Sequence, residues 1–299
     1  MKKVLLVMAA ALCTLGLTVL TVSFVGVGFD FQKLDTVEPS SEVYEFAEGF
    51  DRIVLGVNTA DVRFVVSEDG VARVATAERS DKKHSVLVTD GKLIIRASDE
   101  AWYKQLFGFY FGKEEITVYL PEKTIYSLMA KSSTGDVTLS SGLAFNNVDI
   151  ETNTGDIRVE SEVRGLLLAE IDTGYVFIEN TRTASIKVEG DTSDVTICNM
   201  QISGRVDIET DTGDVKLKNT IVTGNMNIET DTGDIRFDKA DAANLYLVTS
   251  TGDVEGTLLS DKIFDVKTQT GDKELPGSAN GGLCKIRSST GDIEIDIVK

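Results

Sequence analysis

Residues 208–217 read IETDTGDVKL, and residues 228–237 read IETDTGDIRF, 20 positions further along the chain. Related copies recur at steps of 19 or 20 residues towards the C-terminus. Self-similarity at a fixed step of this size predicts a solenoid, in which each repeat buries its apolar face against its neighbours. The residue after the Gly position anchors each copy, and the anchors are Asp136, Asp156, Tyr175, Asp194, Asp214, Asp234, Asp253, Asp272 and Asp292.

Four positions of the repeat are mostly apolar: eight and six residues before the anchor, and one and three residues after it. Apolar residues at every second position indicate a strand with one buried face. Each copy therefore contains a strand, a Thr-Gly-Asp corner, a second strand and a variable stretch that forms a short third side. We predict an all-β fold, a right-handed parallel β-solenoid (β-helix) of about nine coils.

The corner is the most regular part of the repeat. Thr stands two residues before every anchor, and the Gly that follows it is replaced only by Ser193. A column of Gly predicts a backbone with positive φ, and Asp in such a turn accepts hydrogen bonds from turn N–H groups. Tyr175 interrupts the Asp column, so we expect the coils of Tyr175 and Ser193 to carry a local surface specialisation.

A second interpretation of the acidic corner is a ladder of weak cation sites, because stacked carboxylates supply the oxygen ligands that Ca²⁺ prefers. The Gly-rich repeat of calcium-binding β-rolls is absent, so we predict no dedicated metal site and no cofactor. The residues of this candidate ladder are Asp136, Asp156, Asp194, Asp214, Asp234, Asp253, Asp272 and Asp292.

The segments outside the repeats predict further organisation. Residues 4–29 carry no charge and follow two Lys residues, so we predict that residues 1–29 hold a cytoplasmic N-terminus and an uncleaved transmembrane anchor. Residues 30–50 are predicted as a tether, residues 51–132 as irregular β coils that cap the stack, and residues 133–299 as the regular repeats. Everything after residue 29 would then lie outside the cytoplasm of a single-pass membrane protein.

Two segments are candidate contact surfaces. The last copy ends at residues 293–299 without a capping element, so its strand edge is a candidate for end-to-end self-association. A dense aromatic cluster lies between two predicted strands, and it could plug the first coil or bind a partner or the membrane interface. Its members are Trp102, Tyr103, Phe107, Phe109, Tyr110 and Phe111.

Composition and motifs argue against several classes of function. A formal net charge of −18 repels nucleic acid. The only histidine, His84, stands in a polar segment without an evident partner, and the sequence contains no nucleophile elbow, phosphate loop or metal-spaced His/Cys set. Acidic residues recur uniformly at the corners, whereas a glycosidase would concentrate a carboxylate pair in one coil. We therefore predict that the protein is not an enzyme.

The apolar N-terminus, the VYLPE segment at residues 118–122 and the serial Thr-Gly-Asp repeats resemble a bacterial β-strand-repeat family of unknown function, often labelled putative adhesins. The resemblance covers residues 45–299. It implies a cell-envelope solenoid, and some members of the family are tied to envelope-stress systems. We predict a non-enzymatic, adhesin-like binding or scaffold protein for a cell-wall glycan or an envelope protein. The alternatives are a regulatory partner of an envelope-stress system and a β-helix enzyme that degrades envelope polysaccharide.

Overall fold

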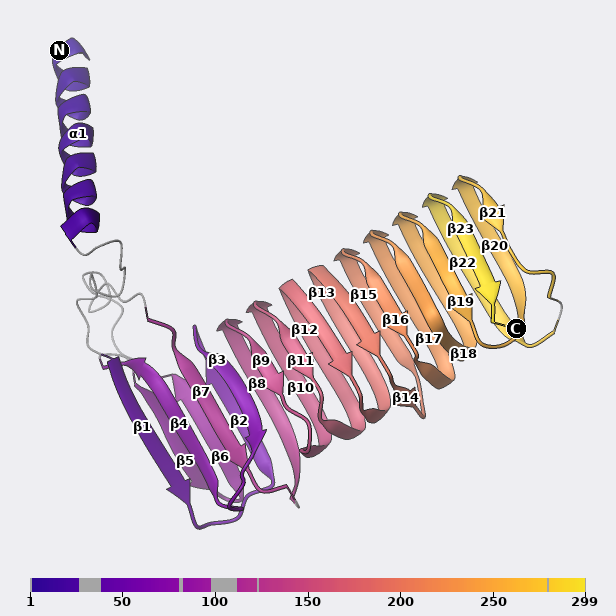
Figure 1. Cartoon of the computed structure of the whole chain (residues 1–299), viewed down its shortest axis with the longest axis horizontal. Helices are drawn as coiled ribbons and strands as arrows, with labels where there is room; N and C mark the ends of the chain where they lie inside the picture. The colour runs from indigo at the N-terminus through magenta and orange to yellow at the C-terminus, as the bar shows by residue number, and fades with distance from the viewer. Residues whose placement is uncertain are drawn as a thin grey trace.

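A computed structural model describes residues 2–26, 39–80, 83–97, 112–122, 124–278 and 280–298. Within these residues, helix α1 (Lys2–Gly26) is followed only by β-strands, which form one elongated rod (Figure 1). The rod is a β-solenoid of about eight turns, which confirms the predicted fold class with one turn fewer than expected. The coil at the end of the rod is incomplete in its second sheet, because strand β21 has only two residues.

Two long sheets run along the rod, and β12 and β13 belong to both because they continue through the corner. In spatial order the first sheet contains β5 (His84–Thr89), β6 (Lys92–Ala97), β2 (Arg52–Val57), β8 (Ile125–Thr134), β10 (Ala144–Thr154), β12 (Glu162–Glu179), β13 (Arg182–Cys198), β15 (Val206–Thr212), β17 (Ile221–Thr232), β18 (Ile235–Thr251), β22 (Gly282–Thr290) and β20 (Lys262–Thr270).

The second sheet contains, besides β12, β13 and the start of β18, the strands β1 (Pro39–Phe46), β4 (Ala72–Arg79), β7 (Glu115–Leu120), β3 (Asp61–Val66), β9 (Val137–Leu139), β11 (Ile157–Val159), β16 (Val215–Lys218), β19 (Val254–Leu258), β23 (Ile293–Ile297) and β21 (Lys273–Glu274). The short β14 (Gln201–Ile202) lies on the third side, where it pairs with the first residues of β13 and β17. This third side was predicted from the variable stretches of the repeat.

The apolar columns of the repeat form the core between the sheets. Val206, Ile208, Val215 and Leu217 are all buried, as the spacing predicts. Most strand pairs along the rod are parallel, and their register keeps equivalent repeat positions side by side, for example Ile208 beside Ile228. Because a shift by one residue would turn these side chains towards solvent, the apolar pattern fixes the register.

The order of the coils in space departs from the order in the chain at the C-terminal end. Strand β18 pairs with β22, and β22 pairs with β20. In the second sheet β19 pairs with β23, and β23 pairs with β21. The final segment of the chain is therefore inserted into the stack, and β20 and β21 form the end of the rod (Figure 1). The prediction that residues 293–299 form the free edge is wrong for Ile293 and Glu294, because β21 of the preceding repeat pairs with these two residues.

The N-terminal end shows a similar exchange. Strand β2 lies between β6 and β8, and β3 lies between β7 and β9. Three antiparallel pairings, β5 with β6, β4 with β7 and β1 with β4, extend both sheets beyond the first parallel coil. Strand β1 occupies part of the predicted tether, and β8 crosses the predicted boundary at residue 132.

The predicted transmembrane anchor is not supported. A helix that spans a bilayer needs about 20 predominantly apolar residues. Among the described residues, the structure has no helix whose length and apolarity suffice for a membrane crossing.

Candidate binding groove

The Thr-Gly-Asp corner is held by a ladder of hydrogen bonds between coils. The backbone N–H of Asp234, for example, donates to Oδ1 of Asp214 at 2.9 Å. The same bond joins donor and acceptor pairs along the rod: Asp136 to Asp61, Asp156 to Asp136, Tyr175 to Asp156, Asp214 to Asp194, Asp253 to Asp234, Asp292 to Asp253 and Asp272 to Asp292. The turn interpretation of the Asp column is confirmed, and the pairing of Asp136 with Asp61 shows that residues 58–62 form a degenerate corner.

The ladder uses only one oxygen, Oδ1, of each bonded Asp. Arg236 binds the other oxygen, Oδ2, of two of these residues. Its guanidinium lies 2.9 Å from Oδ2 of Asp214 and 2.5 Å from Oδ2 of Asp234, and its Nε lies 2.6 Å from Glu255. These carboxylates raise the pKa of Arg236, the hydrogen bond with Glu255 being the largest cause. Within the described residues, no three His, Cys, Asp or Glu side chains are grouped to hold a metal ion, and the cation ladder stays a prediction.

The Gly column is required at the corner for two reasons. Gly233 has a φ of +154°, and a Cβ atom there would lie 1.9 Å from the carbonyl oxygen of Gly213 in the neighbouring coil. Ser193 replaces this Gly in one coil, where Gly190 stands three residues earlier. A Cβ atom at Gly190 would lie 2.0 Å from Oγ of Ser193. Compared with the neighbouring coil, which has Thr210 and Gly213 at these two positions, this coil has the glycine first and the hydroxyl residue second.

Ser193 is therefore not a surface specialisation, because it is buried and its hydroxyl lies 3.3 Å from that of Thr210. Tyr175 does contribute to a surface feature. Its ring stacks on Phe177 with the centroids 6.2 Å apart, and its hydroxyl hydrogen-bonds to Thr196. The guanidinium of Arg158 lies 4.4 Å from the centre of the Phe177 ring, which completes a small aromatic patch on the second sheet.

A second corner, five residues after the anchor, leads into the third side. Asn180, Asn199 and Asn219 have φ angles of 55°, 53° and 46°, and Asn tolerates this left-handed conformation better than most residues. Their amides form a ladder, with Nδ2 of Asn199 donating to Asn180 and Nδ2 of Asn219 donating to Asn199, both at 3.1 Å. This column escaped the sequence analysis, although Asn recurs five residues after three successive anchors.

The third side is hollowed into a groove that we call the third-side groove. One hollow has a volume of 700 Å³ and extends from Ile125 to Arg182. A second hollow has a volume of 440 Å³ and extends from Glu162 to Thr223. Both are lined by Glu162, Arg164 and Arg182, so they form one continuous depression across successive coils.

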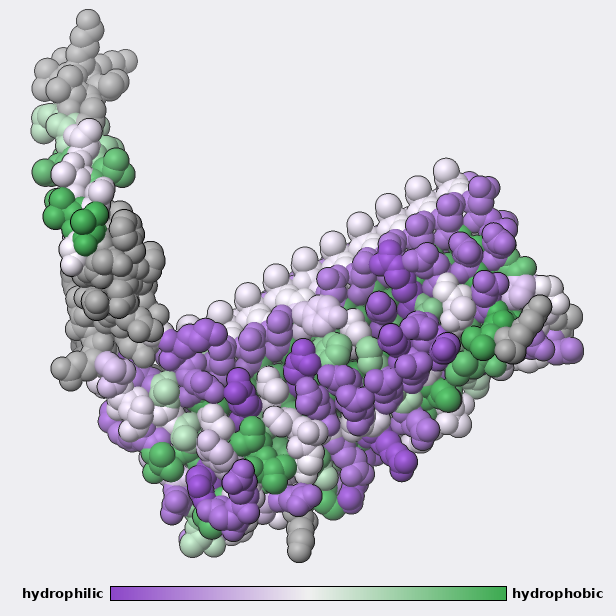
Figure 2. Space-filling view, viewed as in Figure 1, coloured by the Kyte–Doolittle hydropathy of each residue, from purple (hydrophilic) through white to green (hydrophobic). Residues whose placement is uncertain are grey.

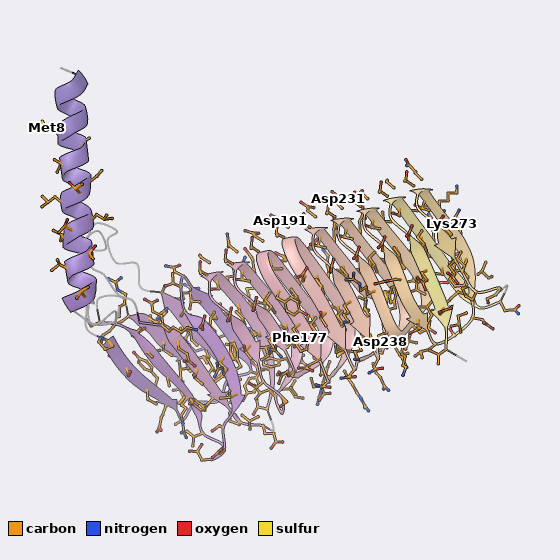
Figure 3. The ribbon with its side chains drawn as sticks, turned by 45° about the horizontal axis from the view of Figure 1, so that its top comes forward. Met8, Phe177, Asp191, Asp231, Asp238 and Lys273 are labelled. Atoms are coloured by element: carbon orange, nitrogen blue, oxygen red, sulfur yellow. The ribbon has the colours of Figure 1, made fainter. Side chains whose placement is uncertain are left out.

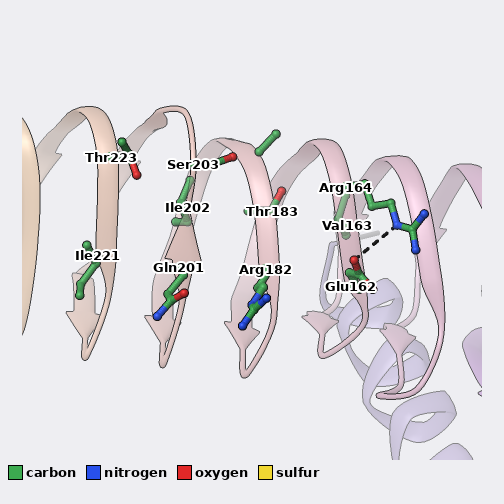
Figure 4. A pocket seen from close by; sticks show the side chains of 11 residues that line it. Glu162, Val163, Arg164, Arg182, Thr183, Gln201, Ile202, Ser203, Ile221 and Thr223 are labelled. Carbon is green, nitrogen blue, oxygen red and sulfur yellow. Dashed lines mark hydrogen bonds and ion pairs between the residues drawn. The ribbon is translucent and has the colours of Figure 1, made fainter.

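Strand pairing places the side chains of this groove in a row. Arg182 pairs with Gln201, and Gln201 pairs with Ile221, so the three side chains stand on neighbouring strands (Figure 4). All three are exposed, whereas the alternate residues Thr183, Ile202 and Val222 are buried beneath them. The groove therefore exposes two hydrogen-bonding side chains, Arg182 and Gln201, and one apolar side chain, Ile221, above a largely apolar floor.

The charges of the groove are partly compensated. Nε of Arg164 lies 3.4 Å from Oε1 of Glu162, and both side chains are about half exposed. Arg182 makes no ion pair within the part of the chain that the structure describes. An exposed guanidinium beside Gln201 can donate several hydrogen bonds to a ligand.

Other candidates from the sequence are placed differently. His84 has a partner, contrary to expectation: its Nδ1 lies 2.5 Å from Oε2 of Glu78, and both side chains are buried in the N-terminal cap. Cys13, Cys198 and Cys284 are all free. The aromatic cluster at Trp102, Tyr103, Phe107, Phe109, Tyr110 and Phe111 lies outside the described residues.

The Thr-Gly-Asp edge and the repeated coils invite comparison with known families. A family model described as Toastrack DUF4097 matches residues 50–295. The chain belongs to the Toastrack DUF4097 family. This assignment confirms the predicted resemblance, and the match includes the N-terminal cap as well as the regular repeats of this toastrack protein.

Solved structures extend the comparison. A putative lipid binding protein from Parabacteroides distasonis is 13% identical, with a TM-score of 0.50 and coverage of 89% of this chain and 98% of that chain. Putative adhesins from Bacteroides fragilis and Parabacteroides distasonis are 16% and 11% identical, with TM-scores of 0.38 and 0.41; they cover 87% and 88% of this toastrack chain and 97% and 98% of their own. At such identities the likeness concerns the fold alone. No curated protein sequence matches the chain.

Proposed function

We propose that this protein is a non-enzymatic, adhesin-like binding or scaffold protein of the bacterial envelope, and that its third-side groove holds an extended polymer. The observation that carries the proposal is the continuity of the groove, since the two hollows share Glu162, Arg164 and Arg182. The names of the similar structures, adhesins and a lipid binding protein, agree with a binding role.

The shape and chemistry of the groove favour a glycan. Neighbouring strands are separated by ~4.8 Å, so equivalent side chains recur at this interval along the groove. A polysaccharide presents hydroxyl groups and apolar ring faces in alternation, and the groove offers Arg182 and Gln201 beside Ile221. A cell-wall glycan is therefore the first candidate ligand, and an extended segment of an envelope protein is the second.

The carboxylates near the groove do not favour hydrolysis. Glu162 is paired with Arg164, and Glu160 lies 3.5 Å from Arg158. A glycosidase needs two carboxyl groups that are free to act on the same glycosidic bond, whereas each of these carboxylates is engaged by an arginine. We accordingly expect binding without cleavage.

Co-sedimentation of the full chain with purified cell walls tests this proposal. We expect saturable binding that weakens roughly 30-fold in the double variant Arg182→Ala/Gln201→Ala, because each of the two side chains contributes a hydrogen bond of about 1 kcal/mol to the ligand. Lys216→Ala, an exposed residue of β16 on another face, is the matched control and should bind as the wild type does.

Three outcomes would count against the proposal. One is wall binding that is indifferent to the groove variant, and another is release of reducing sugar ends during the incubation. The third is the absence of wall binding with retention on protein-containing membranes, which would favour a protein partner in a signalling system.

A further inference from the structure

The two ends of the rod differ in how their cores are closed. At the N-terminal end, the outermost parallel coil has a buried interior, with Leu93, Ile95, Val118 and Leu120 all 0% exposed, and antiparallel strands continue both sheets beyond it. At the other end, Phe264, Val266 and Leu275 occupy equivalent core positions but are only partly buried. Apolar residues are visible at this end of the rod in Figure 2.

The strands of this end have one free side each. Within the described residues, β20 pairs only with β22, and β21 pairs only with β23. An unpaired strand edge presents a row of N–H and C=O groups that can pair with another strand. Apolar core residues and a free edge thus coincide on one surface, which we call the distal end.

We propose that the distal end joins a second copy of this chain, with β20 of the two copies pairing antiparallel about a twofold axis at Val266. The proposal goes beyond the binding function of the groove and rests on different residues. In this register Asp265 of each copy stands opposite Lys267 of the other, and Val266 meets its own counterpart.

The charge pattern selects this register. Asp265 and Lys267 lie on the exposed face of β20, where residues alternate with the partly buried Phe264 and Val266. Moving the axis by one residue in either direction would place Asp265 opposite Asp265 or Lys267 opposite Lys267, and like charges directly opposite are destabilising. A self-complementary edge favours a second copy over an unrelated partner, because a twofold axis uses the same surface twice.

The geometry of the inserted C-terminal segment supports a stable edge. Nη2 of Arg287 on β22 lies 2.5 Å from Oδ2 of Asp265, and its Nη1 donates to the backbone oxygen of Asp265 at 2.6 Å. These contacts fix the middle of β20 against the rod. The strand is therefore already extended and ordered before it meets a second copy.

Light scattering on the full chain in mild detergent, as a function of concentration, tests the proposal. We expect a mass twice that of one chain for the wild type, and the mass of one chain for Lys267→Glu, which places two carboxylates opposite each other at each of two positions. Lys216→Glu, with the same charge change in the middle of the rod, should leave the dimer intact.

A second variant keeps the test independent of charge effects on folding. Val266→Cys puts two thiols on the twofold axis, where the Cβ atoms of opposite residues are about 4.5–5.5 Å apart. Because this separation exceeds that of most disulfides, a short bifunctional thiol reagent is used, and it should give a covalent dimer that the wild type does not form. A wild type that stays monomeric would overturn the proposal. So would a dimer that survives Lys267→Glu and does not crosslink through Val266→Cys.

Discussion

The side-chain nitrogen of Lys262 lies 2.6 Å from Oδ1 of Asp241, although the C-terminal segment of the chain runs between their strands. Both side chains are nearly buried, and Lys262 also donates to the backbone oxygen of Ala242 and to Ser260, each at 2.8 Å. Gly282 stands beside Lys262 in the inserted strand. A Cβ atom at Gly282 would lie 1.7 Å from the backbone oxygen of Ala243, so the inserted strand lies close against β18 at this point. The ion pair between Lys262 and Asp241 therefore holds the outermost coil over the inserted one.

Removing the charge of Lys262 should loosen this end of the rod. Lys262→Met keeps the apolar stem but leaves Asp241 without its partner in a buried position, which typically costs about 3–5 kcal/mol. We expect the amides of β20 to lose roughly 100-fold or more of their protection from hydrogen exchange, since terminal coils open locally. Amides of β15, in the middle of the rod, should keep their protection.

The matched control is Lys218→Met, which removes an exposed partner of Asp238 at 3.4 Å. Exposed pairs contribute about 0–1 kcal/mol, so this variant should hardly change exchange. Adding Asp241→Asn to Lys262→Met should recover part of the protection, because the unpaired charge is then absent. Unchanged β20 exchange in Lys262→Met would show that the ion pair does not hold the end coil.

The exchange of Gly190 and Ser193 gives a second prediction. Gly190→Thr restores the residue usual at this repeat position but drives its Cβ into Oγ of Ser193, and overpacking of this kind costs about 1–3 kcal/mol. Combining it with Ser193→Gly reproduces the corner of the neighbouring coils and should regain most of the loss. Thermal unfolding of the two single variants and the double variant measures the coupling.

Gly56→Thr is the control for this cycle, because a Cβ atom at Gly56 would have no atom within 4 Å. It should change the melting temperature little. If the effects of Gly190→Thr and Ser193→Gly simply add, the two positions do not compensate each other.

Much of the fold could be predicted from the sequence, because the repeat records the burial of each position directly. The order of the terminal coils could not, since any two copies of the repeat offer compatible faces and only the connecting segments distinguish them. One signal was nevertheless present: Lys273 stands where all other copies have an apolar residue after the anchor. The structure places it on β21 at the far end of the rod (Figure 3).

The groove was harder to predict than the core. Arg182, Gln201 and Ile221 all stand seven residues after their anchors, but Arg, Gln and Ile share no chemistry, so this column does not stand out in the sequence. The pairing of β13, β14 and β17 places the three residues side by side. The corner that precedes these residues could have been recognised from the sequence, because Asn180, Asn199 and Asn219 recur at the same position after their anchors. This corner marks where the third side begins.

The Asp ladder predicts a sharp difference between two substitutions. Asp214→Asn keeps an oxygen that can accept from the N–H of Asp234, whereas Asp214→Ala leaves that donor without its partner at the corner. We expect Asp214→Ala to cost about 1 kcal/mol and Asp214→Asn clearly less. Urea unfolding of both variants measures the difference, and equal losses would mean that the charge matters more than the hydrogen bond.

The same ladder bears on cation binding. Because one oxygen of each bonded Asp already accepts a backbone hydrogen bond, we expect Ca²⁺ and a chelator to give the same melting temperature. A rise with Ca²⁺ that disappears in Asp214→Asn would instead establish the cation ladder.

Cys284 predicts how stability depends on pH in the alkaline range. Its thiol is buried in the inserted coil, and this burial raises the pKa of Cys284 from its ordinary 9.0 to about 12. The folded protein therefore holds a proton that the unfolded chain releases first, so the associated stability is complete below about pH 9 and decreases as the pH rises towards about 12. Replacement by Val removes this dependence while keeping an apolar side chain.

The measurement is the urea midpoint of the wild type and of Cys284→Val across this pH range. Other groups titrate there too, so the difference between the two midpoints is the informative quantity. It should stay constant up to about pH 9 and then move in favour of the variant, because only the wild type has a thiol that ionises in the unfolded chain while burial keeps it protonated in the folded protein. A difference independent of pH would mean that Cys284 does not hold its proton in the folded state.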